Sequence, residues 1–318
     1  MARVLVSAPL PGDALNALRA AHEVDVGEDP RGLGKAGIVA RASGAEALLT
    51  LVTDRIDGEV LDAAPSLRVV ANFGVGTDNL DLEALRSRGV VATNTPDVLT
   101  DATADATFAL LLAACRRVAE GDRAVRAGKF TGWAPTDWIG VPVTSATLGI
   151  VGLGRIGRAV ARRAAGFSMR VVYSQRRRAA AEVERALGAT FASLDDLLAA
   201  SDVVVLCCSL NDDSRGLISK ERLAKMKRGG VLVNTARGPI VDEAALAAAL
   251  SAGHLAAAGL DVYAREPLVE PALLACENAV LTPHLGSADA PARAAMARIA
   301  VESVLAVLEG RAPPSRVA

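Results

Sequence analysis

The sequence predicts an α/β protein built from two doubly wound domains with parallel sheets. Short, nearly continuous apolar runs, of which residues 202–207 are typical, alternate with longer segments of helical periodicity along the chain. Strands of this kind are usually buried on both faces of a parallel sheet that helices cover. A length of 318 residues also allows two hydrophobic cores rather than one.

The first domain is expected to start at once with a strand at residues 4–6. Helices at 12–21 and 60–64, the second ended by Pro65, should alternate with strands at 48–52, 67–73 and 89–94. The strand at 67–73 runs into Gly74-Val75-Gly76-Thr77-Asp78, a turn whose glycines expose backbone N–H groups. Such a turn suits either an anion, such as a substrate carboxylate at Val75 and Gly76, or an ordinary strand-to-helix connection.

A long helix is expected to begin near Thr100 and to cross from the first domain to the second. Apolar residues recur at helical spacing and should form its core face: Phe108, Leu111, Leu112, Cys115 and Val118. Residues 128–144 should form an irregular loop that carries both tryptophans, Trp133 and Trp138. These two side chains are expected to pack on a partner subunit or, as the alternative, in a local core.

A glycine-rich turn joins an apolar strand at 148–151 to a helix and a second strand at 169–173. The turn reads Gly152-Leu153-Gly154-Arg155-Ile156-Gly157. Gly152 allows a sharp turn, Gly154 lets the backbone approach a pyrophosphate, and Gly157 lets the helix pack closely on the strand. The helix N-terminus offers free N–H groups and a partial positive charge to that pyrophosphate. The segment therefore predicts a dinucleotide-binding site of the Rossmann type.

The end of the second strand indicates which dinucleotide binds. An enzyme that uses NAD usually has an acid there for the ribose 2′-hydroxyl. This chain has no acid from Met169 to Ala181 and instead has Ser174, Gln175, Arg176, Arg177 and Arg178. Guanidinium groups supply hydrogen-bond donors for a 2′-phosphate, and the absence of a carboxylate removes the repulsion. The sequence therefore predicts NADP(H) as the cofactor, with a merely solvated basic turn as the alternative.

Three polar residues follow strand ends in the second half of the chain. Arg237 follows the strand at 230–234, Glu266 follows the strand at 257–262, and His284 follows the strand at 279–282. Ligands of doubly wound sheets lie beyond the carboxyl ends of the strands. These side chains are therefore expected at the edge where the cofactor binds, although each alone could be an ordinary surface residue.

The three residue types suit reduction of a ketone by a hydride donor. A protonated imidazole at His284 can supply the proton to the developing alkoxide near neutral pH. A carboxylate at Glu266 would favour the imidazolium and fix its ring. The forked guanidinium of Arg237 can grip the carboxylate and carbonyl oxygens of an α-keto acid. The hydride chemistry itself belongs to the cofactor.

Composition limits the remaining classes of function. A net charge of −1 gives no reason to expect a nucleic acid or an anionic membrane as partner. No apolar run reaches the roughly 20 residues of a membrane helix, and strand pattern starts too early for a signal peptide. The four cysteines form neither a disulfide framework nor a metal pattern, so we expect no metal and a cytoplasmic location. Residues 311–318 are expected to form a loose tail after a closing helix at 291–309.

Several of these segments together resemble the D-2-hydroxyacid dehydrogenase family, and most closely its glyoxylate/hydroxypyruvate reductase branch. The resembling segments span nearly the whole chain in the expected order: 74–79, 95–101, 152–157, 234–238, 259–262 and 283–287. The resemblance implies that Arg237, Glu266 and His284 form the catalytic set and that backbone around Val75 and Gly76 binds the substrate carboxylate. It also implies cofactor contacts from Thr235, Ala236, Asp261 and Gly286.

The resemblance further implies a homodimer and two domains. The first is a flavodoxin-like substrate domain of residues 1–99 plus 288–318, and the second is an NADP-binding Rossmann domain of residues 100–287, inserted in the first. The expected activity is NADPH-dependent reduction of glyoxylate to glycolate and of hydroxypyruvate to D-glycerate. Alternatives are a broader D-2-hydroxyacid dehydrogenase for other 2-keto acids or 3-phosphoglycerate, and a non-catalytic NAD(P)-sensing protein that resembles corepressors. The missing acid at Gln175 departs from the wider family and favours NADP.

Overall fold

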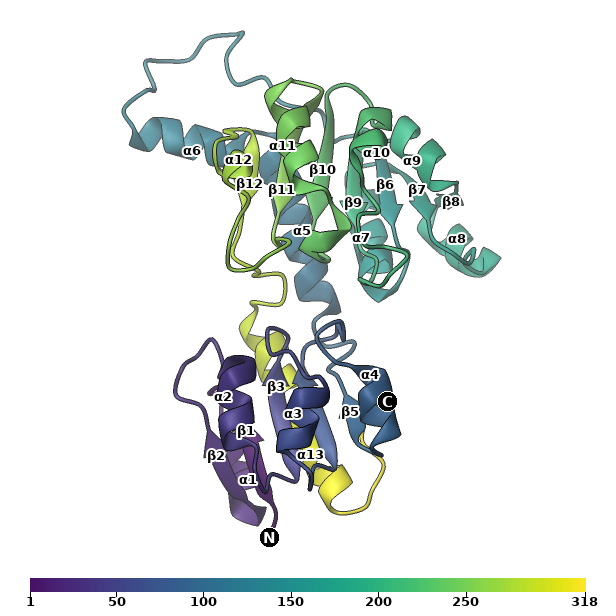
Figure 1. Ribbon diagram of the computed structural model, residues 1–318. Coiled ribbons are helices and arrows are strands. Elements are labelled where there is room, and N and C mark those ends of the chain that lie inside the picture. Colours follow the sequence, from purple (N-terminus) through teal and green to yellow (C-terminus); the bar gives the residue numbers. More distant parts are fainter. The chain divides into compact units, whose positions relative to one another are not determined.

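The computed structural model describes all 318 residues, which form two compact α/β units (Figure 1). Unit 1 contains Met1–Leu99 and Ala288–Ala318, and unit 2 contains Thr100–Ser287. Each unit has one sheet, and all of its named strand pairs are parallel. The predicted fold class of two doubly wound parallel-sheet units is therefore confirmed.

The sheet of unit 1 has the order β2-β1-β3-β4-β5, which is the flavodoxin-like order. Its strands are β1 (Arg3–Val6), β2 (Glu23–Val26), β3 (Ala47–Leu51), β4 (Val69–Phe73) and β5 (Val91–Thr93). Its helices are α1 (Leu15–Ala21), α2 (Gly34–Arg41), α3 (Gly58–Ala63), α4 (Leu82–Ser87) and α13 (Ala290–Leu308). Helices α2, α3 and α4 share one buried cluster with the sheet, while α13 packs on β3, β4 and α1.

The segment after α13 is not the loose tail that the sequence suggested. The N–H of Val317 donates to Ala92 O at 2.8 Å, and the N–H of Ala92 donates to Ala318 O at 3.2 Å. Val317 and Ala318 also pack against the cluster that contains Val70 and Ala92. The tail therefore lies along the outer edge of β5, where the free backbone groups of an edge strand give it hydrogen-bond partners.

The sheet of unit 2 has the order β12-β11-β10-β9-β6-β7-β8. Numbered within the unit, this is the Rossmann order 3-2-1-4-5-6 with one further strand. Its strands are β6 (Thr147–Val151), β7 (Arg170–Ser174), β8 (Ala189–Phe191), β9 (Val203–Leu206), β10 (Gly230–Asn234), β11 (Leu255–Leu260) and β12 (Ala279–Leu281). Its α-helices are α5 (Thr100–Cys115), α6 (Val118–Arg126), α7 (Arg155–Ala165), α8 (Ala181–Leu187), α9 (Leu194–Ala200), α10 (Lys220–Lys225), α11 (Glu243–Ser251) and α12 (Pro271–Leu274), with a 3₁₀ turn at Gly238–Ile240.

The long helix that starts at Thr100 is shorter than its apolar pattern suggested. It ends at Cys115, and Arg117 has a left-handed backbone (φ 53°) that separates α5 from α6. Val118 was expected on the core face but is 57% exposed, so that prediction is wrong. No helix or strand lies between α6 and β6, as expected for the irregular loop. No helix of the chain combines the length and the apolar character that crossing a membrane requires.

Candidate active site

The carboxyl ends of the unit 2 strands form one edge that carries most of the predicted site. Parallel register aligns Val151 at the end of β6 with Ser174 on β7 and Leu206 on β9. It likewise aligns Asn234 on β10 with Leu260 on β11. The glycine turn, the basic turn and the segments that carry Arg237, Glu266 and His284 all leave the sheet at this edge.

The glycine turn has the geometry of a pyrophosphate cradle. Gly152 has φ +96°, and a side chain there would come within 2.8–2.9 Å of the Cys207–Cys208 backbone. A Cβ on Gly157 would lie 2.1 Å from Gly152 O, so this position requires glycine for close packing of α7. Gly154, in contrast, has open space beside it, and no side chain caps the first N–H groups of α7. The turn thus leaves backbone donors and room for an anionic group.

Gln175 joins the glycine turn to the basic turn. Its Oε1 accepts a hydrogen bond from Leu153 N at 2.9 Å, and its Nε2 donates to Arg177 O at 2.7 Å. Ser174 is buried, and its carbonyl accepts from Gly152 N at 2.8 Å. The two turns are therefore one hydrogen-bonded assembly, in which an uncharged amide stands where an NAD enzyme usually has an acid.

The three arginines of the basic turn are not equivalent. Arg178 donates two hydrogen bonds to Glu184, at 2.8 and 2.9 Å, and Tyr173 donates a third at 2.6 Å. These bonds lower the pKa of Glu184 to about 2, so the Arg178–Glu184 pair persists at neutral pH. Arg176 makes an exposed ion pair with Asp213 at 3.2 Å.

Arg177 differs from its two neighbours because its guanidinium is exposed and makes no hydrogen bond or ion pair. Only its backbone carbonyl is engaged, by Gln175. Of the three guanidinium groups in the turn, that of Arg177 is the one with all of its donors available to a ligand.

His284 and Glu266 form a hydrogen-bonded pair. Nδ1 of His284 lies 2.8 Å from Oε2 of Glu266, and Oε1 of Glu266 accepts from Tyr263 N at 3.0 Å. Burial alone would raise the pKa of Glu266. The hydrogen bond and charge of His284, with the Tyr263 N–H and the Arg237 charge, outweigh burial and lower that pKa below its usual value. The carboxylate is therefore ionised at neutral pH, and Nε2 of His284 remains available to exchange a proton.

Asp261 holds the loop that presents His284. Its carboxylate accepts hydrogen bonds from Thr282 Oγ1 at 2.6 Å and from the N–H groups of Leu285 and Gly286, both at 2.8 Å. Its carbonyl accepts from His284 N at 2.9 Å. These bonds fix His284 in the left-handed region (φ 54°), which a non-glycine residue rarely adopts. Asp261 and Gly286 thus support the histidine loop, and their contact with a cofactor stays a prediction.

Arg237 follows β10 in a loop that Asn234 stabilises. Nδ2 of Asn234 donates to Arg237 O at 2.9 Å, and Oδ1 accepts from Ala236 N at 3.0 Å. The guanidinium of Arg237 donates to Ala236 O at 2.8 Å. A Cβ on Gly238 would overlap the backbone of Tyr263, so β10's loop lies directly against the segment that leads to Glu266. Oγ1 of Thr235 is hydrogen-bonded to Thr107 on α5 at 2.7 Å.

The predicted carboxylate-binding turn lies in unit 1, after β4. The N–H groups of Val75 and Gly76 make no hydrogen bond within the chain, whereas both carbonyls are occupied. Val75 O accepts from Asn94 Nδ2 at 2.8 Å, and Gly76 O accepts from Asn72 Nδ2 at 2.7 Å. The turn thus offers two free backbone donors in a fixed conformation, which suits an anion.

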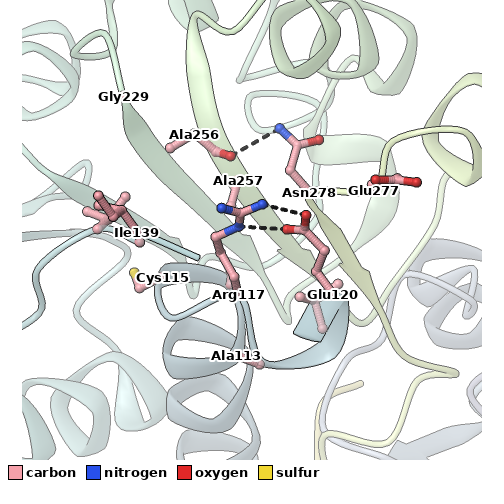
Figure 2. Close-up of a pocket in the computed structure, with 14 residues that line it drawn as sticks. Ala113, Cys115, Arg117, Glu120, Ile139, Gly229, Ala256, Ala257, Glu277 and Asn278 are labelled. Atoms are coloured by element: carbon pink, nitrogen blue, oxygen red, sulfur yellow. Dashed lines mark hydrogen bonds and ion pairs between the residues drawn. The ribbon is translucent and has the colours of Figure 1, made fainter. Parts of the chain in front are cut away.

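A cavity of about 460 Å³ lies at the opposite edge of the unit 2 sheet and is not this site. Figure 2 shows that Gly229, Ala256 and Asn278, at the amino ends of β10, β11 and β12, line it together with residues of α5 and α6. Two of its charged groups are paired with each other, since Arg117 donates to Glu120 at 2.5 and 2.8 Å. It contains none of the predicted catalytic residues.

Comparison with known families agrees with this arrangement. The family model described as D-isomer specific 2-hydroxyacid dehydrogenase, NAD binding domain, matches residues 108–286. The chain belongs to this family of oxidoreductases. The resemblance noted in the sequence is therefore confirmed.

Two relatives and two solved structures are similar to this 2-hydroxyacid dehydrogenase over nearly its whole length. Glyoxylate reductases of Thermococcus onnurineus and Pyrococcus horikoshii are each 45% identical to it over 319 residues, which is 99% of this chain and 95% of theirs. A structure from Thermus thermophilus is 49% identical, with a TM-score of 0.91 over 99% of this chain and 100% of that one. An NADPH-dependent glyoxylate/hydroxypyruvate reductase from Sinorhizobium meliloti, solved with NADP and malonate, is 33% identical, with a TM-score of 0.89 over 100% and 97% of the two chains.

Sequence reasoning missed the residues that support the functional groups of this dehydrogenase. Asn72, Asn94 and Asn234 each lie at or just after a strand end and hold a loop backbone through a side-chain amide. An asparagine near a strand end was the sequence feature that could have predicted this supporting role. Asp261 was expected beside the cofactor, and its role in holding the histidine loop was not foreseen.

Proposed function

We propose that the protein reduces glyoxylate to glycolate and hydroxypyruvate to D-glycerate with NADPH. The hydrogen-bonded pair of His284 and Glu266, at the same sheet edge as the glycine turn, is the observation that carries this proposal. The names of the two glyoxylate reductase relatives support glyoxylate as a substrate. The four free cysteines suit a reducing compartment such as the cytoplasm.

The residues of the glycine and basic turns fit NADP. Open space beside Gly154 and the uncapped N-terminus of α7 suit the pyrophosphate. The unpaired guanidinium of Arg177, with the exposed Arg176 beside it, suits a 2′-phosphate. When bound, the cofactor supplies the hydride.

The chain's own residues then hold the keto acid and supply the proton. Arg237 grips the carboxylate and carbonyl oxygens through its fork, and the N–H groups of Val75 and Gly76 receive the carboxylate. His284 gives the proton on Nε2 to the carbonyl oxygen as the alkoxide develops. Glu266 keeps the imidazole oriented through Nδ1 and places a negative charge beside it.

Cofactor preference tests the proposal and separates the roles of the arginines. The wild type is expected to have a higher kcat/KM with NADPH than with NADH when it reduces glyoxylate. Arg177→Ala should lower kcat/KM for NADPH by about 10–100-fold, because it removes a charge-assisted hydrogen bond, and should leave NADH use nearly unchanged. Gln175→Asp should shift the cofactor preference toward NADH more than Arg177→Ala does, because it places a carboxylate near the ribose.

Arg162→Ala, which removes an exposed arginine of α7 away from the basic turn, is the matched control and should behave as wild type. A wild-type preference for NADH would contradict the NADPH proposal. Binding of NADPH without turnover of any 2-keto acid, including phosphohydroxypyruvate and branched or aromatic acids, would favour the cofactor-sensing alternative.

The proposal includes a homodimer in which the α6 segment contacts a second copy. Large apolar side chains are exposed along α6 and the loop after it: Val118, Val125, Phe130, Trp133, Trp138 and Ile139. In Figure 1 this loop extends outward from the rest of unit 2. Trp133 is 85% exposed, so the alternative in which it fills a local core is wrong. Large apolar side chains that are exposed together on one segment favour a protein–protein contact.

The mass of the protein in solution tests the dimer. We expect the mass of two chains at micromolar concentration in sedimentation or light scattering. Trp133→Ser combined with Ile139→Ser should shift the equilibrium toward monomer, because it removes two large apolar side chains from the contact. Leu274→Ser, at an equally exposed leucine of α12, is the control. A wild type that is monomeric at every concentration would refute the dimer and leave the reductase proposal intact.

A further inference from the structure

The conformation of the Val75–Gly76 turn is set by hydrogen bonds to its carbonyl groups. Gly74 O accepts from Thr95 N at 3.0 Å, and Val75 O accepts from Asn94 Nδ2 at 2.8 Å. In a planar trans peptide the C=O and the following N–H point in opposite directions. Fixing Gly74 O therefore directs the N–H of Val75, and fixing Val75 O directs the N–H of Gly76.

Both of these hydrogen bonds come from one dipeptide just after β5. Asn94 is 8% exposed and Thr95 is fully buried, so neither donor competes with much solvent. Thr95 uses its backbone, which any residue other than proline provides. Asn94 uses a side-chain amide, which can deliver either its NH₂ group or its oxygen to Val75 O, depending on how the amide is rotated. Only the NH₂ orientation stabilises the turn.

The orientation of the Asn94 amide is set from the tail. Ser315 Oγ donates to Asn94 Oδ1 at 2.6 Å, which leaves Nδ2 to face Val75 O. The tail is held in place by the backbone hydrogen bonds of Val317 and Ala318 to Ala92 on β5. A continuous chain of contacts thus runs from the tail through Ser315 and Asn94 to the N–H of Gly76.

We propose that Asn94 and Ser315 are positioning residues for the substrate carboxylate, with Ser315 selecting the amide orientation of Asn94 that holds the Gly76 N–H in place. The inference rests on the proposed function, in which this turn binds the carboxylate of a 2-keto acid. Neither residue touches the substrate. Their effect is on how strongly the turn binds an anion.

Ser315→Ala is the first test because it removes one hydroxyl from a half-buried position and should fold normally. We expect KM for glyoxylate to rise by about 3–10-fold, the loss expected for one neutral hydrogen bond, with kcat and KM for NADPH nearly unchanged. Ser315→Thr keeps the hydroxyl and should restore KM. Asn94→Asp should act more strongly, because a carboxylate oxygen would then face Val75 O and repel it.

Arg316→Ala is the matched control in the tail. Arg316 donates only to Ala318 O at 2.7 Å and does not contact Asn94, so its loss should leave KM for glyoxylate unchanged. If Arg316→Ala and Ser315→Ala raise KM equally, the tail acts only as general support and the inference is wrong. A wild-type KM in Ser315→Ala would also overturn it.

Direct binding of oxalate, measured by calorimetry, separates this inference from the proposed function. Oxalate should bind wild type and Ser315→Thr equally and Ser315→Ala about 3–10-fold more weakly. If wild type fails to reduce any keto acid but this pattern in oxalate binding remains, the proposed function fails and the inference stands. If wild type reduces glyoxylate but oxalate binds all variants equally, the inference fails alone.

Discussion

Replacing His284 by alanine is expected to lower kcat for glyoxylate reduction by about 10²–10⁴-fold, the usual contribution of a positioned general acid. The imidazole is the titratable group whose Nδ1 is fixed by Glu266 and whose Nε2 remains available. Binding of NADPH, followed by calorimetry, should stay near the wild-type value, because the glycine and basic turns lie on other strands of the sheet.

His254→Ala is the matched control for this substitution. His254 lies at the start of β11, away from the catalytic edge, and its Nε2 lies 3.1 Å from Leu223 O. This variant should keep kcat. An unchanged kcat in the His284 variant would show that another group supplies the proton.

Glu266→Gln extends this prediction to pH. The pKa of Glu266 is lowered, so its carboxylate stays charged at pH values below the usual pKa of a glutamate. The charge is lost only as pH falls through the lowered pKa. Near neutral pH the carboxylate therefore places a negative charge beside the imidazole of His284, and glutamine does not. In the variant, the part of the acid decline of kcat/KM for reduction that arises from protonation of Glu266 should be absent. A profile that is reduced in height but unshifted would indicate that Glu266 only orients the ring.

The fold was predictable because most strands of both sheets are buried on both faces and form apolar runs. Two strands were not foreseen: β2, with the sequence Glu23-Val24-Asp25-Val26, and β8, at Ala189–Phe191. Both are edge strands. An edge strand buries less surface and carries more polar residues, so its sequence resembles that of a loop.

The chemistry-bearing residues of the site were more accessible to sequence reasoning than the residues that support them. His284, Glu266 and Arg237 follow strands, and parallel topology alone suggested that they leave the sheet at one edge. Ser315 supports Asn94 across 221 positions of sequence, a contact that no local pattern encodes. The tail that carries Ser315 lacks helical or strand periodicity, and its backbone hydrogen bonds to Ala92 on β5 could not be read from its own sequence.

Arg237→Lys is expected to raise KM for glyoxylate by about 10–100-fold, with a smaller effect on kcat. Lysine keeps the positive charge but cannot hold carboxylate and carbonyl oxygens through two parallel hydrogen bonds, and the loss of a charge-assisted bond has this magnitude. Steady-state kinetics with glyoxylate measures the effect. Arg228→Lys, at an exposed arginine before β10, is the control for a conservative change outside the catalytic edge and should have no effect.

Arg237→Gln separates the geometric contribution of the guanidinium from its charge. The positive charge of Arg237 contributes to the lowered pKa of Glu266, so its removal should let that pKa rise toward its usual value. The acid limb of the pH–rate profile is then expected to move to higher pH in Arg237→Gln but not in Arg237→Lys. If lysine preserves both KM and the pH profile, charge alone explains the role of Arg237, and the bidentate grip on the keto acid must be abandoned.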